Sequence, residues 1–131
     1  MTRDEQIGTI LLVDDNVDIR ELARRFLEAA GYTVATASDG EEGLRFYQEH
    51  QSSIGLLLTD VLMPNIDGLE LADRVLGIDS QLPVLFMSGD DWHAHRGLEC
   101  LAKPFHPAEL VEKVGRVLKA NAHLERTAPA A

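Results

Sequence analysis

Cysteine and positive charge are both scarce in this chain. Cys100 is the single cysteine, so the chain can form neither an internal disulfide nor a cluster of thiolate metal ligands. Only 12 lysines and arginines stand against 22 acidic residues, and a formal net charge of −10 argues against direct binding to nucleic-acid phosphates. No apolar run approaches the ~20 residues of a membrane span, and no signal-peptide core follows the N-terminus. We therefore expect a cytoplasmic protein that does not insert into a membrane.

What the chain does contain is a series of short apolar runs separated by helix-like stretches. At 131 residues and 45% hydrophobic content, it can bury the core of one domain. The predicted strands are Thr9–Val13, Thr33–Ala37, Ile54–Thr59, Pro83–Met87 and Cys100–Ala102. Continuous apolar runs of this length are typical of parallel strands that are buried on both faces, which predicts an α/β fold.

Apolar residues at helical spacing and local end signals predict the helices between these strands. One helix follows the first strand and ends at Gly31, and a second, capped by Ser38 or Asp39, runs to about Gln51. Further helices are predicted over about 69–76 and from about 106 to 118. We expect an N-terminal lead-in over 1–8, one domain over 9–120 and a flexible tail over 121–131, with no further domain after it.

Polar residues follow the predicted strands at the point where each strand ends. Asp14-Asp15, Asp60, Ser88 and Lys103 hold these places. Because ligands of open α/β sheets bind beyond the carboxyl ends of the strands, these side chains should meet at one edge. Three carboxylates on strands ~4.8 Å apart repel one another unless a cation lies among them. A few hard oxygen ligands with room for water suit Mg²⁺.

Simpler explanations exist for two of these motifs. Asp14-Asp15 could cap the helix that follows, and Ser88-Gly89 could be an ordinary turn. At a strand end that faces acids, however, Lys103 can pair with a carboxylate and later with a phosphoryl oxygen, and the following Pro104 favours a turn there. In the same setting, Ser88 offers a hydroxyl donor, and Gly89 leaves its amide open to a ligand.

Four motifs, in this order, resemble the receiver domain of bacterial two-component response regulators. They are Val13-Asp14-Asp15, Thr59 to Gly68 (TDVLMPNIDG), Met87-Ser88-Gly89 and Ala102 to Phe105 (AKPF). The resemblance extends from about residue 9 to residue 118 and is strongest to single-domain or hybrid-kinase-type receivers. It implies a flavodoxin-like (CheY-like), doubly wound sheet of five parallel strands in the order 2-1-3-4-5.

The resemblance also implies a role for each motif residue. Asp60 would be the phosphoacceptor, and Asp15, Asp60 and the Leu62 backbone carbonyl would bind Mg²⁺ directly, with Asp14 acting through water. Lys103 and Gly89 would contact the phosphoryl group, and Ser88 would be the switch hydroxyl. The implied partners are a sensor histidine kinase or a histidine phosphotransfer protein and a downstream protein. The chain would be a monomer or weak dimer and not an enzyme that turns over a substrate.

Two features depart from the family pattern. Cys100 stands where an aromatic residue usually reports activation, and only fourteen residues, 89–102, separate Ser88 from Lys103. The fourth helix should therefore be shortened or missing, and signalling would use the loop directly. Trp92 is a candidate contact of that loop, although it could equally cover the edge of the core.

Two other functions and one further metal site are weighed against the sequence. A phosphorylation-independent interaction module could keep the receiver scaffold, which the altered output face would suit. A phosphatase that forms an aspartyl phosphate would need an acid two residues after Asp60, where Leu62 stands. A metal site made of His93, His95, Cys100 and His106 has no fixed spacing, and a solvated polar loop explains these residues more simply.

Overall fold

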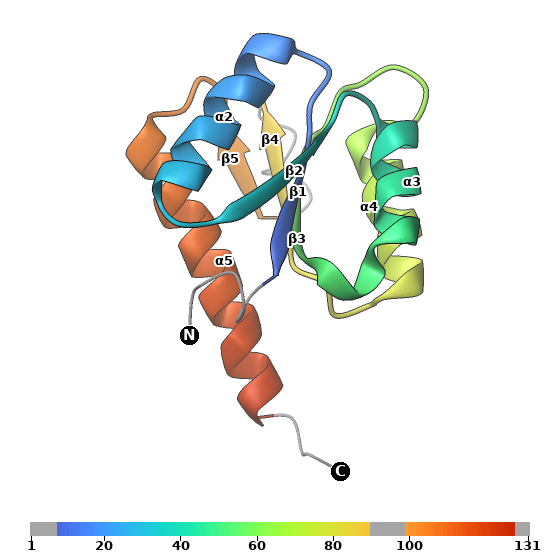
Figure 1. Cartoon of the computed structure of the whole chain (residues 1–131), viewed down its shortest axis with the longest axis vertical. Coiled ribbons are helices and arrows are strands. Elements are labelled where there is room, and N and C mark those ends of the chain that lie inside the picture. Colours follow the sequence, from blue (N-terminus) through green and yellow to red (C-terminus); the bar gives the residue numbers. More distant parts are fainter. Residues whose placement is uncertain (1–7, 90–98, 128–131) are drawn as a thin grey trace.

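The computed structural model describes residues 8–89 and 99–127, with side chains through residue 120. A five-stranded parallel sheet in the order β2-β1-β3-β4-β5 forms its centre (Figure 1). The strands are β1 (Thr9–Val13), β2 (Thr33–Ala37), β3 (Ile54–Asp60), β4 (Val84–Ser88) and β5 (Cys100–Ala102). The predicted 2-1-3-4-5 order is confirmed, and the predicted strands agree with the observed ones to within one residue at each end.

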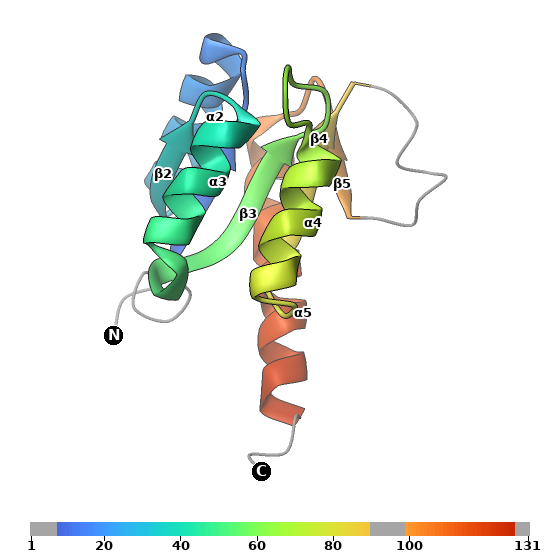
Figure 2. The same cartoon turned by 90° about the vertical axis from the view of Figure 1, so that its right-hand side faces the viewer.

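Helices cover both faces of this sheet. Their bounds are α2 Val17–Ala29, α3 Gly40–Glu49, α4 Gly68–Ile78 and α5 Pro107–Thr127, with a short 3₁₀ turn at Gln51–Ser53. Helices α2 and α5 lie on one face, and α3 and α4 lie side by side on the other (Figures 1 and 2). The connections from β1 to β2, from β2 to β3 and from β3 to β4 each pass through a helix, which is the doubly wound arrangement.

The central strands supply side chains to two separate cores. Leu11 and Val13 of β1 pack toward α3 and α4, whereas Ile10 and Leu12 pack toward α2 and α5. All four side chains are at most 1% exposed. Full burial of each such side chain contributes about 1.5–3 kcal/mol to folding. Burial on both faces explains why the strands read as continuous apolar runs rather than as alternating ones.

Short polar side chains fix the starts of three helices. The side chains of Asn16, Asp39 and Asp67 accept hydrogen bonds from backbone N–H groups three residues later, at 3.1, 2.8 and 2.9 Å. Asp39 is thus the cap of α3 rather than Ser38. Asn16 caps α2, so neither Asp14 nor Asp15 is used as the cap of that helix.

Helix α5 is longer than the sequence analysis expects. We expected a flexible tail from about Asn121, but the helix continues to Thr127. The residues from 119 to 127 contain neither proline nor glycine and include alanine, leucine, glutamate and arginine, which favour helix. The shortened or missing fourth helix was expected within residues 90–98, which lie outside the described residues. No helix in the described part of the chain has the length and apolar character needed to cross a membrane.

Candidate functional site: an acidic cluster and a lysine at the carboxyl edge of the sheet

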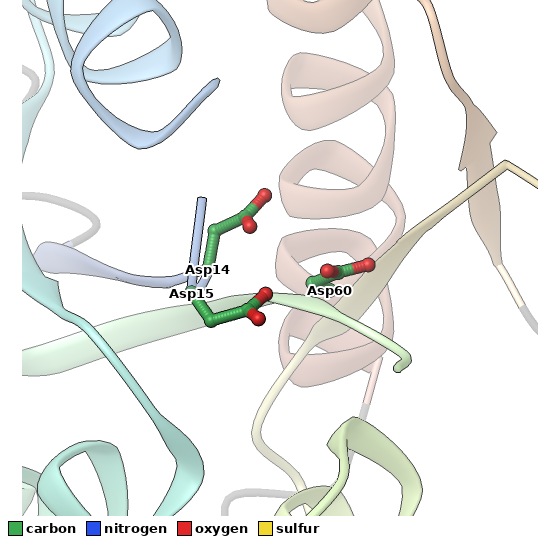
Figure 3. Close-up of side chains that lie close together, drawn as sticks. All are labelled: Asp14, Asp15 and Asp60. Atoms are coloured by element: carbon green, nitrogen blue, oxygen red, sulfur yellow. The ribbon is translucent and has the colours of Figure 1, made fainter. Parts of the chain in front are cut away.

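The parallel strands bring the predicted site residues to one edge of the sheet. Asp14 follows β1 directly, Asp60 ends β3, Ser88 ends β4 and Lys103 follows β5. Asp14 and Asp15 lie together at the end of β1, close to Asp60 at the end of the neighbouring strand (Figure 3). Asp14, Asp15 and Asp60 can each offer a carboxylate oxygen such that the three atoms lie within 4.8 Å of one another. In the described part of the chain, this is the one group of three or more potential ligand side chains that is so closely spaced.

Every polar group of Asp14 forms a hydrogen bond with another residue. Its side chain is fully buried, and its carboxylate accepts hydrogen bonds from the Asn16 N–H at 2.9 Å and from the Lys103 ammonium at 3.0 Å. Its own N–H donates to the Ala37 carbonyl at 3.2 Å, and its carbonyl accepts from the Arg20 guanidinium at 2.8 Å. By contrast, Asp15 is exposed, so its carboxylate faces solvent at the same edge.

Lys103 follows the edge strand β5, and its side chain reaches the acidic residues at the ends of β1 and β3. Its Nζ atom lies 3.0 Å from Asp14 Oδ2 and 3.3 Å from Asp60 Oδ1, and its side chain is 18% exposed. Its backbone N–H donates to the Ser88 carbonyl at 2.8 Å, and the Lys103–Pro104 peptide bond is cis. The predicted contact between this lysine and the acids is therefore confirmed.

The electrostatic environment of Asp60 favours a further positive charge. Burial is the largest cause that raises the pKa of Asp60, and the neighbouring Asp14 and Asp15 raise it further. The ammonium of Lys103 opposes this shift but does not reverse it. Lys103 thus pairs with two of the three carboxylates, and a divalent cation would neutralise the remaining negative charge. The donor set consists of hard carboxylate oxygens, one of them solvent-facing, which fits Mg²⁺ with several retained waters.

Gly68 allows the loop after β3 to pack closely against the backbone of Asp60, the phosphoacceptor candidate. The N–H of Gly68 donates to the Val61 carbonyl at 2.8 Å, and a Cβ atom at Gly68 would overlap the backbone carbonyl of Asp60. Asn65 takes a positive φ of 67° within the same loop. The Leu62 side chain is 65% exposed, and the role of its backbone carbonyl as a ligand stays a prediction.

The remaining predicted residues are placed in different ways. Ser88 is 2% exposed, and nothing lies within 4 Å of a Cβ built on Gly89. Cys100 begins β5 beside Phe86 of β4, is half-buried against the core, and has a thiol pKa that burial raises. Trp92 lies outside the described residues, so its proposed role is not tested by the structure.

The alternative histidine and cysteine metal site gains no support from its described members. His106 begins the turn before α5, where its ring accepts a hydrogen bond from the Ala108 N–H at 3.1 Å. Its own N–H donates to the Glu109 carboxylate at 2.7 Å. These contacts give His106 a capping role. His93 and His95 lie outside the described residues.

Sequence reasoning overlooked two residues that shape the site. Gly68 was named only as the last residue of the TDVLMPNIDG motif, although its place after Asp67 signalled the start of a helix. Arg20 was not considered, because a partner six positions from Asp14, across a loop and a helix start, leaves no periodic signal. Both act on the backbone of an acidic residue rather than on its side chain.

Comparison with known proteins agrees with this geometry. Residues 10–115 match the model of the response regulator receiver domain. The chain is 39% identical to the response regulator receiver protein CpdR of Brucella abortus, over 83% of this chain and 95% of that protein. It is 36% identical to the CpxR homolog of Haemophilus influenzae, a transcriptional regulatory protein, over 88% of this chain but only 52% of that protein. It therefore spans nearly all of one relative and about half of the other.

Solved structures show the same relationship. The receiver domain of the hybrid histidine kinase CckA is 40% identical, with a TM-score of 0.75, over 85% of this chain and 99% of that one. A response regulator receiver domain protein from Clostridium thermocellum is 27% identical, with a TM-score of 0.80, over 89% and 98% of the two chains. The four strand-end motifs, their meeting at one sheet edge and these matches show that the chain belongs to the family of response regulator receiver domains of two-component systems.

Proposed function

We propose that this receiver accepts a phosphoryl group on Asp60 with the help of Mg²⁺. The observation that carries the proposal is the arrangement of Asp60 beside Asp14, Asp15 and Lys103 at the carboxyl edge of the sheet. An Asp60 Oδ atom would attack the phosphorus of a phosphohistidine, the phosphorus–nitrogen bond would break, and an aspartyl phosphate would remain. The released imidazole would take up a proton.

Three carboxylates are available to hold the metal. Asp15 and Asp60, with the Leu62 backbone carbonyl, would bind it directly, and the well-bonded Asp14 would act through water. Bound Mg²⁺ supplies charge neutralisation and alignment of the transferring phosphoryl group. Because Asp60 is largely buried and its pKa is raised, its free carboxylate is costly, and the cation and Lys103 together would keep it ionised for attack.

Lys103 and Ser88 would respond to the new phosphoryl group. In the structure, Lys103 pairs with Asp14 and Asp60, and after transfer its ammonium would also meet a phosphoryl oxygen. Ser88 ends the strand beside β3 and is buried, and its hydroxyl would be drawn toward the same group. Gly89 would offer its amide. This differential contact would shift the balance between two conformations of the domain.

The chain would therefore be a phosphoacceptor in a phosphorelay rather than an enzyme that turns over a substrate. A sensor histidine kinase or a histidine phosphotransfer protein would supply the phosphoryl group, and a downstream protein would read the switched state. The chain itself would be a monomer or weak dimer. A phosphorylation-independent module would have little use for a buried acceptor among three crowded carboxylates, so the geometry does not favour that alternative.

Intact mass spectrometry after incubation with acetyl phosphate tests this proposal. Wild type should gain one phosphoryl group in the presence of Mg²⁺ and none after chelation. Asp60→Asn should gain none, whereas Asp73→Asn, which alters an exposed acid on α4, should behave as wild type. Labelling of Asp60→Asn would show that another residue is the acceptor. If a cognate kinase also failed to label wild type, the receiver would work without phosphorylation.

A further inference from the structure

Arg20 reaches back from α2 to the strand end that carries the acidic pair. Its Nη1 atom donates to the backbone carbonyl of Asp14 at 2.8 Å, while its own backbone N–H donates to the Asn16 carbonyl at 3.0 Å. The Arg20 side chain therefore closes the loop between β1 and α2 from the helix side. A charge-assisted hydrogen bond to a partly buried carbonyl is stronger than a neutral one.

We propose that Arg20 is a positioning residue for the metal site, acting through the peptide that joins Asp14 to Asp15. The carbonyl of Asp14 belongs to the same rigid peptide plane as the N–H of Asp15, so a bond to that carbonyl restricts the backbone from which the Asp15 side chain extends. The Asp14 side chain is already held by Asn16 and Lys103. Asp15 is exposed, and its backbone is the part of the acidic pair that Arg20 can orient.

The contact distinguishes Arg20 from its neighbours on the same helix. Arg24 forms ion pairs with Glu21 at 2.6 Å and with Glu28 at 2.8 Å, both on α2. Arg25 is exposed one position further along. Only Arg20 among these arginines bonds to the backbone of a site residue in the described part of the chain. Arg20 therefore contacts the backbone of the site, whereas Lys103 contacts the carboxylates themselves.

The proposal predicts a change in Mg²⁺ affinity that is opposite in sign to the change predicted from the charge of Arg20 alone. A positive charge near a divalent cation repels it, so removal of Arg20 by charge alone would tighten Mg²⁺ binding. If Arg20 instead preorganises the acidic pair, its removal weakens Mg²⁺ binding despite the lost repulsion. The inference rests on the proposed Mg²⁺ site, and its test must therefore separate the two.

The experiment is a calorimetric Mg²⁺ titration of wild type, Arg20→Gln and Arg20→Lys, with Arg25→Gln as the matched control. Arg25→Gln removes the same charge from the same helix without touching Asp14. Arg20→Gln should raise the Mg²⁺ dissociation constant at least about tenfold, as loss of a charge-assisted hydrogen bond implies. Arg25→Gln should leave it unchanged or slightly lower, and Arg20→Lys should recover part of the loss. Equal or tighter binding by Arg20→Gln would overturn the proposal.

A second measurement on the metal-free protein keeps the two proposals distinguishable. The ¹⁵N chemical shift of Asp15 reports the hydrogen bond to the preceding Asp14 carbonyl. This shift should change in Arg20→Gln and not in Arg25→Gln, while the shifts of the buried strand residues stay as in wild type. An unchanged Asp15 shift would overturn the positioning role. If wild type bound no Mg²⁺, the proposed metal site would fail, whereas the shift would still show whether Arg20 holds the peptide.

Discussion

The carboxyl edge of the sheet has two halves that are built differently. The acidic half consists of Asp14, Asp15 and Asp60 at the ends of β1 and β3, and the basic half consists of Ser88 and Lys103 at β4 and β5. Strand β3 has seven residues, six of them buried, whereas β5 has three, of which only Leu101 is buried. Asp14 and Asp60 thus lie at the ends of strands that are almost entirely buried.

The basic half depends more on its own polar contacts. Beside β4, a hollow of about 360 Å³ is lined by α4, by Val84 and Phe86 of β4, and by Glu99 just before β5. Lys103 is nevertheless held in place, through its two ion pairs and its backbone bond to Ser88. Packing of β1 and β3 therefore positions Asp14 and Asp60, and these two carboxylates in turn position the lysine. Four substitutions test this difference.

Removal of Lys103 should have the largest effect, because its ion pairs with Asp14 and Asp60 join the two halves. Lys103→Met leaves the fully buried Asp14 without its ammonium, which should cost about 3 kcal/mol of unfolding free energy. Phosphorylation by acetyl phosphate should slow at least ~100-fold, as for loss of a charge that stabilises a transition state. Denaturant melts and mass spectrometry measure the two effects. Adding Asp14→Asn should restore stability but not phosphorylation, and recovery of both would contradict this division of roles.

Gly68→Ala should distort the acidic half at the backbone of Asp60. A Cβ atom there would overlap the Asp60 carbonyl, so the start of α4 must shift, with an expected loss of about 2 kcal/mol. Gly77→Ala on the same helix is the control, since its Cβ would meet nothing within 4 Å. The control should gain about 0.5 kcal/mol from lower chain entropy. Equal stability of the two variants in urea melts would show that the loop yields freely.

Asp60→Asn should stabilise the metal-free protein at neutral pH. The pKa of Asp60 is raised in the folded state, so the native protein binds more protons than the unfolded chain as pH rises above ~3.9. The unfolding free energy of wild type should therefore fall as pH rises through the raised pKa, and Asp60→Asn should lack this loss. Thermal melts should show higher stability of the variant at pH 7 and no difference at strongly acidic pH.

Mg²⁺ should make wild type more stable than Asp60→Asn at pH 7. Mg²⁺ at 100 times its dissociation constant stabilises a native-state site by about 2.7 kcal/mol, and Asp60→Asn has lost one of the proposed ligands. Wild type should therefore gain more from Mg²⁺ than the variant does. A variant that is less stable than wild type without metal at pH 7 would mean that the Lys103 pairing outweighs burial at this carboxylate.

Cys100 in the basic half should show the smallest effect. Burial raises its thiol pKa, so at neutral pH its thiolate fraction should be lower than that of an exposed cysteine. Alkylation by iodoacetamide should be slower than for a free cysteine, and faster in denaturant. Cys100→Ala should cost about 1 kcal/mol or less, because the side chain is only half-buried. Rapid alkylation of the native protein would indicate that β5 opens readily.

The strand-end motifs made much of the site predictable. Asp14, Asp60, Ser88 and Lys103 each follow an apolar run, and the rule that parallel strands end at one edge is enough to bring them together. The end of α5 was misplaced, because no residue near Asn121 stops a helix and only weak helix propensities favour its continuation to Thr127. Such ends depend on weak propensities, which sequence patterns resolve poorly.

The sequence by itself determined the α/β fold class and the set of chemical groups at the edge, because hydrophobic runs and strand-end polar residues are local patterns. The strand order followed from the resemblance of the motifs to receiver domains. Only the tertiary structure decided that Asp14 is fully bonded while Asp15 faces solvent, and that Lys103 contacts both Asp14 and Asp60. It alone placed Arg20 on the Asp14 carbonyl and Gly68 against the backbone of Asp60. The physical reason is that burial and hydrogen bonds between distant segments depend on how the elements pack, and no local pattern of residues encodes that packing.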